Sequence, residues 1–291
     1  MLNAFCVDTE EWFHVCGVKT PYSDPATWQD APSHVVRNTD VLLKFLDDAG
    51  VRGTFLCLGW VAEQHPSLIR RLAGAGHEIG CHGYLHQLVY TMTPDEFETD
   101  LQRSLAILRD LSGQPVSVYR APSFSITNEC FWAYPILSRN GVEVDVSLVP
   151  ARRDNGGVDG LHRDPFLLKT SDGQVKCFPV SVMTLLGRAI PFSGGGYLRL
   201  LPQSVINAGF RQNHRQKRVG MCYIHPREID PDQPRLPLPR IKSFKYYVNL
   251  RTTQRKLRHL LQRFRFSTVA DVVATVEQWP EYTLSSAKID N

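Results

Sequence analysis

Short apolar stretches rich in β-branched residues recur along the chain and alternate with segments of helical pattern. Seven of these stretches are predicted strands, at residues 2–8, 51–58, 77–82, 116–120, 142–147, 176–181 and 219–225. Strands that are separated by helices are joined by crossovers rather than by tight hairpins, so the alternation predicts parallel βα units. The pattern therefore places the chain in the α/β class.

The helix that follows Thr93 has the clearest signals. Thr93 lies in the N-cap position, Pro94 in the first helical position, and Glu96 completes a capping box. Helical patterns also cover residues 35–48, 66–75, 128–139 and 251–264. Most of residues 150–200 and the proline-rich residues 226–240 are predicted to be long loops at the rim of the sheet, where ligand sites of α/β folds lie.

The chain has 291 residues, of which 43% are hydrophobic and 21% charged, as in a soluble enzyme. We expect a single domain over residues 1–291, with a basic C-terminal extension from about residue 230 packed on it. The sequence contains no secretory signal and no apolar run of about 18 residues, so we expect a cytoplasmic protein. Its seven cysteines form no CxxC pair and are expected to be reduced and mostly buried.

Positive charge gathers in the C-terminal third of the chain. Residues 199–270 contain 16 Lys and Arg residues against three acidic ones. Such a surface could attract an anionic glycan, a lipid-linked saccharide or a membrane face. A solvated basic helix face is the structural alternative. The charge does not indicate a nucleic-acid-binding protein, because no recognition fold or aromatic platform accompanies it.

Acidic residues follow the first predicted strand directly, in the run Asp8-Thr9-Glu10-Glu11. In an extended chain, Asp8 and Glu10 point to one face and Glu11 to the other, so Asp8 and Glu10 form the natural pair. A turn of helix would pair Asp8 with Glu11 instead. Acidic residues are also common in the first turn of a helix, which is the structural alternative.

His82 and His86 follow the third predicted strand. Their spacing of four lets two imidazoles share a metal ion when the segment turns helically. Two neutral imidazoles and one carboxylate form a hydrolytic site that leaves a position for water. Because the histidines end one strand and the acidic run ends another, the sequence predicts a metal centre at this end of the sheet.

Arg120 and His225 end two further predicted strands. A buried Arg120 guanidinium can pair with Asp8 and fix its orientation. Pro122 stiffens the next loop, which could aim the backbone N–H of Ser123 at a developing oxyanion. A histidine at the end of the last strand can enter the site opposite the base and protonate a leaving amine. The structural alternative for Arg120 is an ordinary salt bridge at the end of a strand, and for His225 it is a buried core histidine.

Taken in order, these segments resemble the motifs of the NodB-type polysaccharide deacetylases, carbohydrate esterase family 4. The matching motifs are Asp8-x-Glu10, His82-x-x-x-His86, Arg120-Ala-Pro122, Asp145-Val-Ser147 and Ile224-His225-Pro226. The resemblance extends from residue 2 to about residue 230. Residues 194–202, 225–228 and 242–273 further resemble the branch of the family found beside bacterial exopolysaccharide and surface-glycan loci.

The resemblance implies a distorted (β/α)7 barrel that binds one divalent metal ion, usually zinc and in some members cobalt or nickel. The metal ligands would be Glu10, His82 and His86. Asp8 would be the catalytic base, and His225 would be the catalytic acid. These roles follow from the position of each residue in the family's motifs.

The resemblance implies supporting roles for three more residues. Arg120 would tether the base, the backbone N–H of Ser123 would bind the oxyanion, and Asp145 would orient or charge the catalytic histidine. The sequence departs from the family at two places. Thr9 separates two acids that the commonest family form places side by side, and the last motif, which usually begins with a leucine, has Tyr223 two residues before the histidine.

The implied activity is hydrolysis of the N-acetyl group of a sugar in a bacterial polysaccharide or its precursor, at a non-peptide carbon–nitrogen bond. The partner would be an N-acetylated glycan or a lipid-linked saccharide, with peripheral membrane contact through the basic surface. Two alternatives stay open. One is an amidohydrolase of small molecules on the same scaffold, and the other is a catalytically inactive glycan-binding protein.

Overall fold

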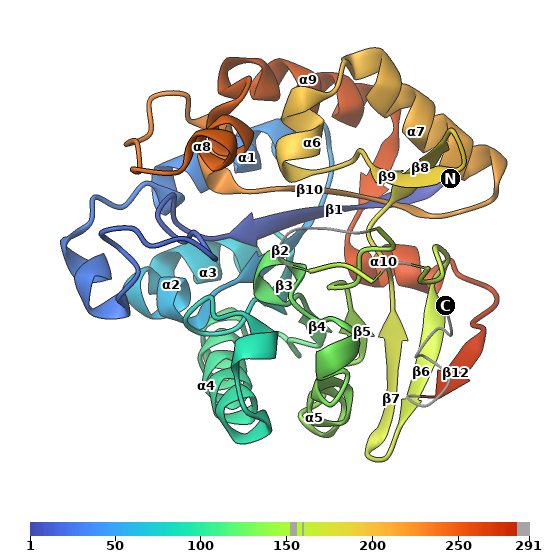
Figure 1. The fold of residues 1–291 in the computed structure, drawn as a ribbon, viewed down its shortest axis with the longest axis horizontal. Helices are drawn as coiled ribbons and strands as arrows, with labels where there is room; N and C mark the ends of the chain where they lie inside the picture. The colour runs from blue at the N-terminus through green and yellow to red at the C-terminus, as the bar shows by residue number, and fades with distance from the viewer. Residues whose placement is uncertain (152–155, 159, 284–291) are drawn as a thin grey trace.

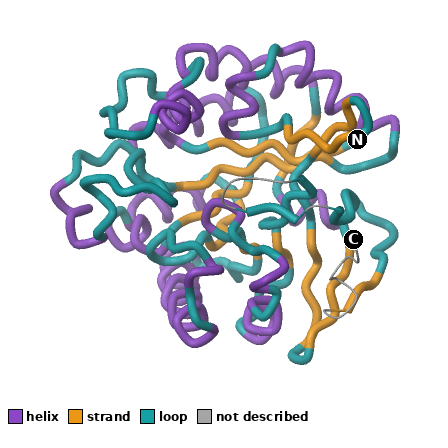
Figure 2. The backbone as a smooth tube through the Cα atoms, in the orientation of Figure 1, coloured by secondary structure: helices purple, strands orange, loops and turns teal. Residues whose placement is uncertain are grey.

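The computed structural model describes residues 1–151, 156–158 and 160–283. Its main sheet contains seven parallel strands, and helices lie around the outside of this layer (Figures 1 and 2). In spatial order these strands are β10 (Gly220–Ile224), β1 (Leu2–Thr9), β2 (Thr54–Cys57), β3 (Glu78–Cys81), β4 (Val118–Tyr119), β5 (Val144–Asp145) and β7 (Gly173–Cys177). All seven were predicted from the sequence, with bounds that differ by a few residues.

Ten α-helices are assigned in the described part of the chain. They are α1 (Val35–Asp48), α2 (Gly59–Gln64), α3 (Pro66–Gly74), α4 (Pro94–Ser112), α5 (Ala133–Arg139), α6 (Gly195–Leu200), α7 (Gln203–Arg215), α8 (Arg240–Tyr247), α9 (Leu250–Arg263) and α10 (Val269–Ala274). The predicted helices at 35–48, 66–75 and 251–264 correspond to α1, α3 and α9. The helix predicted at 128–139 is divided into the short turn η4 (Asn128–Cys130) and α5. None of the described helices is long and apolar enough to cross a membrane.

Strand β1 divides its side chains between two apolar cores. Ala4 and Cys6 belong to the inner cluster, whereas Phe5 and Val7 belong to the outer cluster that packs against the helices. Because successive side chains of a strand point to opposite faces, this alternation gives the sheet one enclosed face and one helix-covered face.

The sheet curls back on itself. Val180, which follows β7, and Met221 of β10 share the inner cluster, although β7 and β10 lie at opposite ends of the seven-strand run. The backbone N–H of Met221 donates to Ser181 Oγ at 2.7 Å and so bridges the two ends. The fold is therefore a distorted α/β barrel, which confirms the fold class that the sequence predicted.

The prediction that most of residues 150–200 form long loops is wrong in part. β6 (Phe166–Thr170) pairs antiparallel with β7 and extends the sheet together with β12 (Glu281–Thr283). β8 (Val182–Leu185) and β9 (Arg188–Pro191) form a separate hairpin. Strands β6, β8 and β9 each bury only some of their residues, so their apolar patterns are too short to recognise in the sequence.

The C-terminal segment returns to the barrel as far as the structure describes it, up to Thr283. β11 (Arg265–Ser267) pairs in parallel with the start of β1. Helix α9 contacts α6 and the turn η5 (Pro226–Ile229). The N–H of Val269, at the start of α10, donates to Thr54 Oγ1 at 2.7 Å. These contacts position the last two helices against strands near the N-terminus.

The capping box of α4 gives a test of local stability. Thr93 Oγ1 accepts from the N–H of Glu96 at 3.3 Å, and the Glu96 carboxylate accepts from the N–H of Thr93 at 2.8 Å. We expect Thr93→Ala to lower the free energy of unfolding by about 1 kcal/mol, because a first-turn N–H loses its partner. Thr99→Ala, at an exposed position of the same helix, is the control and should be neutral or stabilising. Equal effects of both substitutions in chemical denaturation would contradict the capping role.

Candidate metal centre and active site

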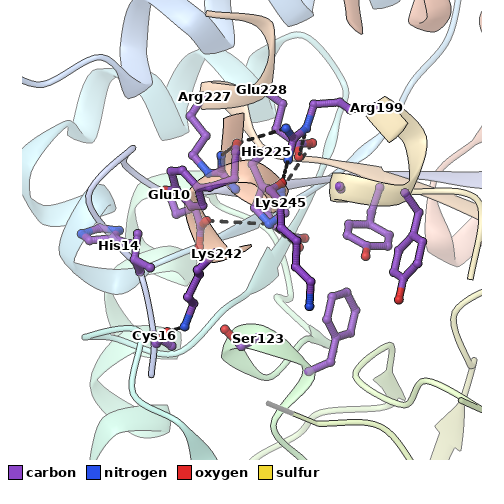
Figure 3. Close-up of a pocket in the computed structure, with 18 of the residues that line it drawn as sticks. Glu10, His14, Cys16, Ser123, Arg199, His225, Arg227, Glu228, Lys242 and Lys245 are labelled. Carbon is purple, nitrogen blue, oxygen red and sulfur yellow. Dashed lines mark hydrogen bonds and ion pairs between the residues drawn. The ribbon is translucent and has the colours of Figure 1, made fainter. Parts of the chain in front are cut away.

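Polar side chains line a cavity of about 350 Å³ at the carboxyl ends of the parallel strands. Asp8 comes from the end of β1, His82 follows β3, Ser123 follows β4, and His225 follows β10. Arg199 of helix α6 and Lys242 and Lys245 of helix α8 also line the cavity (Figure 3). This is the end at which ligand sites of parallel α/β folds are built.

Glu10, His82 and His86 lie together at one side of the cavity. Glu10 Oε2 is 2.6 Å from Nε2 of His86 and 3.8 Å from Nε2 of His82. The three side chains are buried, and one donor atom from each lies within 4.8 Å of the others. Within the described ranges, this is the one group of three or more His, Cys, Asp or Glu side chains that could hold a metal ion.

The surroundings of this cluster fit a divalent metal ion. His82 Nδ1 donates to the C=O of Arg120 at 2.8 Å, which directs the Nε2 lone pair toward Glu10. His86 Nδ1 lies 3.2 Å from Cys16 Sγ, so its Nε2 also faces the carboxylate. Glu10 Oε2 is buried, and no donor meets it in hydrogen-bonding geometry. Such convergence of buried acceptor atoms is costly unless a cation lies among them, and one carboxylate with two imidazoles suits zinc.

The segment from His82 to His86 is a loop and not a helical turn. Gly83 and His86 have positive φ angles of 76° and 54°. Two backbone N–H groups of this loop donate to the Asp100 carboxylate at 2.9 and 3.3 Å. Since a positive φ is uncommon for residues other than glycine, the loop depends on these contacts for its shape. Asp100 was not predicted, because nothing in the sequence links it to the histidines.

Asp8 is buried at the end of β1 and forms an ion pair with Arg120. Arg120 is fully buried and also donates through Nε to the C=O of Val146 at 3.2 Å. The predicted pairing of these two residues is confirmed. A buried carboxylate that an arginine holds in this way keeps one orientation toward the cavity.

Glu11 points away from the cavity, as the extended-strand argument predicted. Its carboxylate accepts from the backbone N–H groups of His34 and Val35 at 3.0 to 3.1 Å, at the start of α1. A negative charge is favourable at a helix N-terminus. Glu11 therefore has a structural role, and Glu10 is the acid that joins Asp8 in the cavity.

His225 faces the acidic side of the cavity. Its Nε2 lies 3.7 Å from Asp8 Oδ2 and 3.7 Å from Glu10 Oε1. Its Nδ1 lies 3.5 Å from Glu228 Oε2, and its backbone N–H donates to the same oxygen at 3.2 Å. Burial lowers the pKa of His225, but the carboxylates of Glu10, Glu228 and Asp8 outweigh burial and raise it above its ordinary value.

The prediction that Asp145 orients the catalytic histidine is wrong. Asp145 does not line the cavity, and its carboxylate accepts from the Tyr134 hydroxyl at 3.0 Å and from the N–H of Ser147 at 3.2 Å. Burial raises the pKa of Asp145 to about 6. Glu228 takes the position beside His225 instead, because the turn η5 brings a side chain three residues later back to the imidazole.

Glu228 is in turn held by Arg199, a residue that the sequence analysis did not single out. The Arg199 Nε donates to Glu228 Oε1 at 3.0 Å, and both side chains are buried. Burial raises the pKa of Glu228, but Arg199 and His225 lower it to about 2. Arg199 also donates to three carbonyl groups at the end of α8, at 2.9 to 3.0 Å, those of Lys245, Tyr246 and Val248. Arg199 therefore connects the carboxylate behind His225 with helix α8.

Ser123 and Tyr223 also line the cavity. Ser123 has a positive φ of 54° in the turn η3 (Pro122–Phe124). The ring of Tyr223 packs on Gly194, where an added Cβ would lie only 2.1 Å from a ring carbon. The glycine-rich segment before α6 thus makes room for the tyrosine that departs from the family pattern.

The chain matches two family models. Residues 26–141 match "Polysaccharide deacetylase", and residues 146–274 match "Domain of unknown function (DUF3473)". A peptidoglycan-N-acetylglucosamine deacetylase of Bacillus cereus is 32% identical over 108 residues, 37% of this chain and 38% of that protein. A peptidoglycan deacetylase of Helicobacter pylori is 33% identical over 111 residues, 37% of this chain and 36% of that protein. The chain thus spans little more than a third of the length of these curated relatives.

A crystal structure from Mycobacterium smegmatis, named as a polysaccharide deacetylase, has a TM-score of 0.61 and 21% sequence identity to this chain. The match covers 94% of this chain and 89% of that one. At this level of identity, the likeness supports the fold. Over residues 26–141 the sequence is thus similar to polysaccharide deacetylases, and the fold of the chain is similar to that of a protein named as one.

Proposed function

We propose that this chain is a metal-dependent deacetylase that hydrolyses the N-acetyl group of a sugar in a bacterial polysaccharide or its precursor. The observation that carries the proposal is the meeting of three groups of side chains in one cavity. These are the Glu10, His82 and His86 cluster, Asp8 paired with Arg120, and His225 beside Glu228. The names of the relatives, which are peptidoglycan deacetylases, support the reaction type.

A divalent ion, which we expect to be zinc, would be held by Glu10, His82 and His86. When bound, it would supply Lewis-acid chemistry that polarises the acetyl carbonyl and acidifies water. The second imidazole nitrogens of His82 and His86 keep their contacts with Arg120 C=O and Cys16 Sγ, and these contacts hold both rings in position.

Two protein groups move protons in the proposed reaction. Asp8 accepts a proton from the attacking water, and Arg120 fixes its orientation during the transfer. The backbone N–H of Ser123 donates to the oxyanion that forms at the acetyl carbon. His225 then donates a proton to the departing sugar nitrogen, and acetate leaves. The base and the acid come from the ends of different strands, so one group can accept a proton while the other donates one.

The assignment of the metal ligands predicts different effects for two adjacent acids. Glu10→Gln should lose bound metal on dialysis, because the cluster loses its one negative ligand. Glu11→Gln should keep its metal and lose stability instead, because its carboxylate caps α1. Elemental analysis and thermal denaturation of both variants separate the effects. Metal retained by Glu10→Gln would show that the ligand set is wrong.

The assignment of the base predicts that Asp8→Asn lowers kcat by about 10²- to 10⁴-fold, because an amide cannot accept the proton from water. Its metal content should stay equal to that of the wild type. Asp145→Asn is the matched control and should keep its kcat, because Asp145 lies outside the cavity. Acetate release at the wild-type rate by Asp8→Asn would refute the role of Asp8.

Glu228 should set the alkaline limit of activity through His225. The acid must be protonated, and the Glu228 carboxylate raises the pKa of His225. Removal of this charge in Glu228→Gln lowers that pKa, so the alkaline limb of kcat/KM should move to lower pH. A pH–rate profile measures the shift. An unmoved limb, or a shift to higher pH, would contradict the contact between Glu228 and His225.

A further inference from the structure

One wall of the cavity is basic. Arg227 of the turn η5 and Lys242 and Lys245 of helix α8 line it, and Figure 3 labels all three. These three residues form a basic wall. The positive charge of this region is visible in the sequence, but its position beside the predicted site is not.

The carboxylates that line the cavity have partners outside this wall. Asp8 pairs with Arg120, Glu228 pairs with Arg199, and Glu10 belongs to the metal-ligand cluster. None of the three forms an ion pair with a residue of the basic wall. No direct ion pair with these acids accounts for the basic wall, although the charge of Arg227 contributes, after Arg199 and His225, to the lowered pKa of Glu228.

The surroundings of Arg227 give the strongest support for an anion site. Its side chain is buried, with 7% of the residue exposed, and it forms no ion pair with any carboxylate in the part of the chain that the structure describes. Its guanidinium lies 3.5 Å above the ring of Tyr246, and Nη1 donates to the C=O of Tyr246 at 3.3 Å. Its Nε has no hydrogen-bond partner. A buried arginine without a carboxylate is costly, and a negatively charged ligand would offset this cost.

Lys242 places the basic wall close to the reacting groups. Its Nζ donates to the C=O of Cys16 at 2.6 Å, and Cys16 Sγ lies 3.2 Å from Nδ1 of the metal ligand His86. Arg227 stands two residues after His225 in the chain. An anionic group bound by this wall would thus belong to the sugar that loses its acetyl group or to the next sugar along the chain.

Helix α8 is fixed in place before any ligand binds. Arg199 donates to three carbonyl groups at its C-terminal end. At the same end, the hydroxyl of Tyr246 donates to the C=O of Trp12 at 2.6 Å. A wall that is already ordered costs little conformational entropy when a ligand binds.

We infer that the cavity takes an acidic N-acetylated sugar, whose carboxylate or phosphate group binds the basic wall. This inference rests on the proposed deacetylase function and names its substrate class. Both groups present paired oxygen atoms that accept charge-assisted hydrogen bonds from arginine and lysine. A chain of neutral N-acetylhexosamines carries no group that would use these cations.

The test compares three oligosaccharides of equal length with the zinc-loaded full chain. One is neutral N-acetylglucosamine oligomer, one contains an N-acetylated aminouronic acid, and one carries a phosphate group. We expect kcat/KM to be at least about tenfold higher for an acidic substrate than for the neutral one, the value of one good charge-assisted contact. Comparison of kcat/KM for the two acidic substrates shows whether the wall prefers a carboxylate or a phosphate group. Added salt should reduce the advantage of the preferred acidic substrate over the neutral one.

Three variants test whether the basic wall causes the preference for an acidic substrate. Lys242→Gln should remove most of the advantage of the acidic substrate, because it should lower kcat/KM for the acidic substrate by a much larger factor than for the neutral one. Arg227→Lys keeps the charge but loses the planar guanidinium. It should reduce the advantage of the acidic substrate less than Lys242→Gln does. Arg251→Gln is the matched control, because Arg251 is exposed on α9 outside the cavity, and it should change neither value. Equal kcat/KM for neutral and acidic substrates, unaffected by Lys242→Gln, would overturn the inference and leave the deacetylase proposal intact.

A binding measurement separates this inference from the proposed reaction. If no oligosaccharide releases acetate, the proposed function fails. Calorimetric titration with the deacetylated acidic and neutral oligosaccharides then tests the basic wall alone. Tighter binding of the acidic form that Lys242→Gln weakens supports the wall as an anion site, and equal binding of both forms overturns it.

Discussion

The two-residue repeat of β1 is the constraint on which the rest of the site depends. β1 is paired with β10 on one side and β2 on the other, so its register cannot slip without loss of both ladders. With Cys6 in the inner core, Asp8 must face the cavity. Glu10 lies just past the end of the strand, where its N–H donates to the C=O of Asp8 at 3.0 Å, and its side chain joins the metal-ligand cluster. The spacing that departs from the common family form thus places both carboxylates in the cavity.

The buried charges of the site are arranged in pairs. Asp8 is held by Arg120, and Glu228 is held by Arg199. Removal of charges from water is expensive, and a partner at hydrogen-bonding distance recovers much of that cost. The pairs also fix two orientations that the proposed chemistry needs, namely a carboxylate that faces water and a carboxylate that stabilises an imidazolium. His225 lies between them, and its raised pKa reflects the acids around it.

The two segments that match family models contribute different parts of one cavity. His82, His86 and Arg120 lie in the segment at 26–141, whereas His225 and the residues of helix α8 lie in the segment at 146–274. Strands β1 and β5 lie outside both segments and join them in one sheet, because β1 pairs with β2 and β10, and β5 pairs with β4 and β7. The first segment supplies two of the three metal ligands, and the second supplies the histidine opposite them and the wall that a substrate would meet.

The sequence by itself determined the seven parallel strands, the helices with a clear apolar face, and five of the acids and histidines in the cavity, namely Asp8, Glu10, His82, His86 and His225. These elements bury regular apolar patterns, and a strand fixes the direction of alternate side chains. Tertiary structure alone decided the position of α8, which buries no residue completely and is held by Arg199, more than 40 positions away in the chain. It also decided that Glu228 and not Asp145 stands beside His225. Both carboxylates are visible in the sequence, but which of them reaches the imidazole depends on the turn after β10 and on the buried contacts of Asp145 with Tyr134 and Ser147.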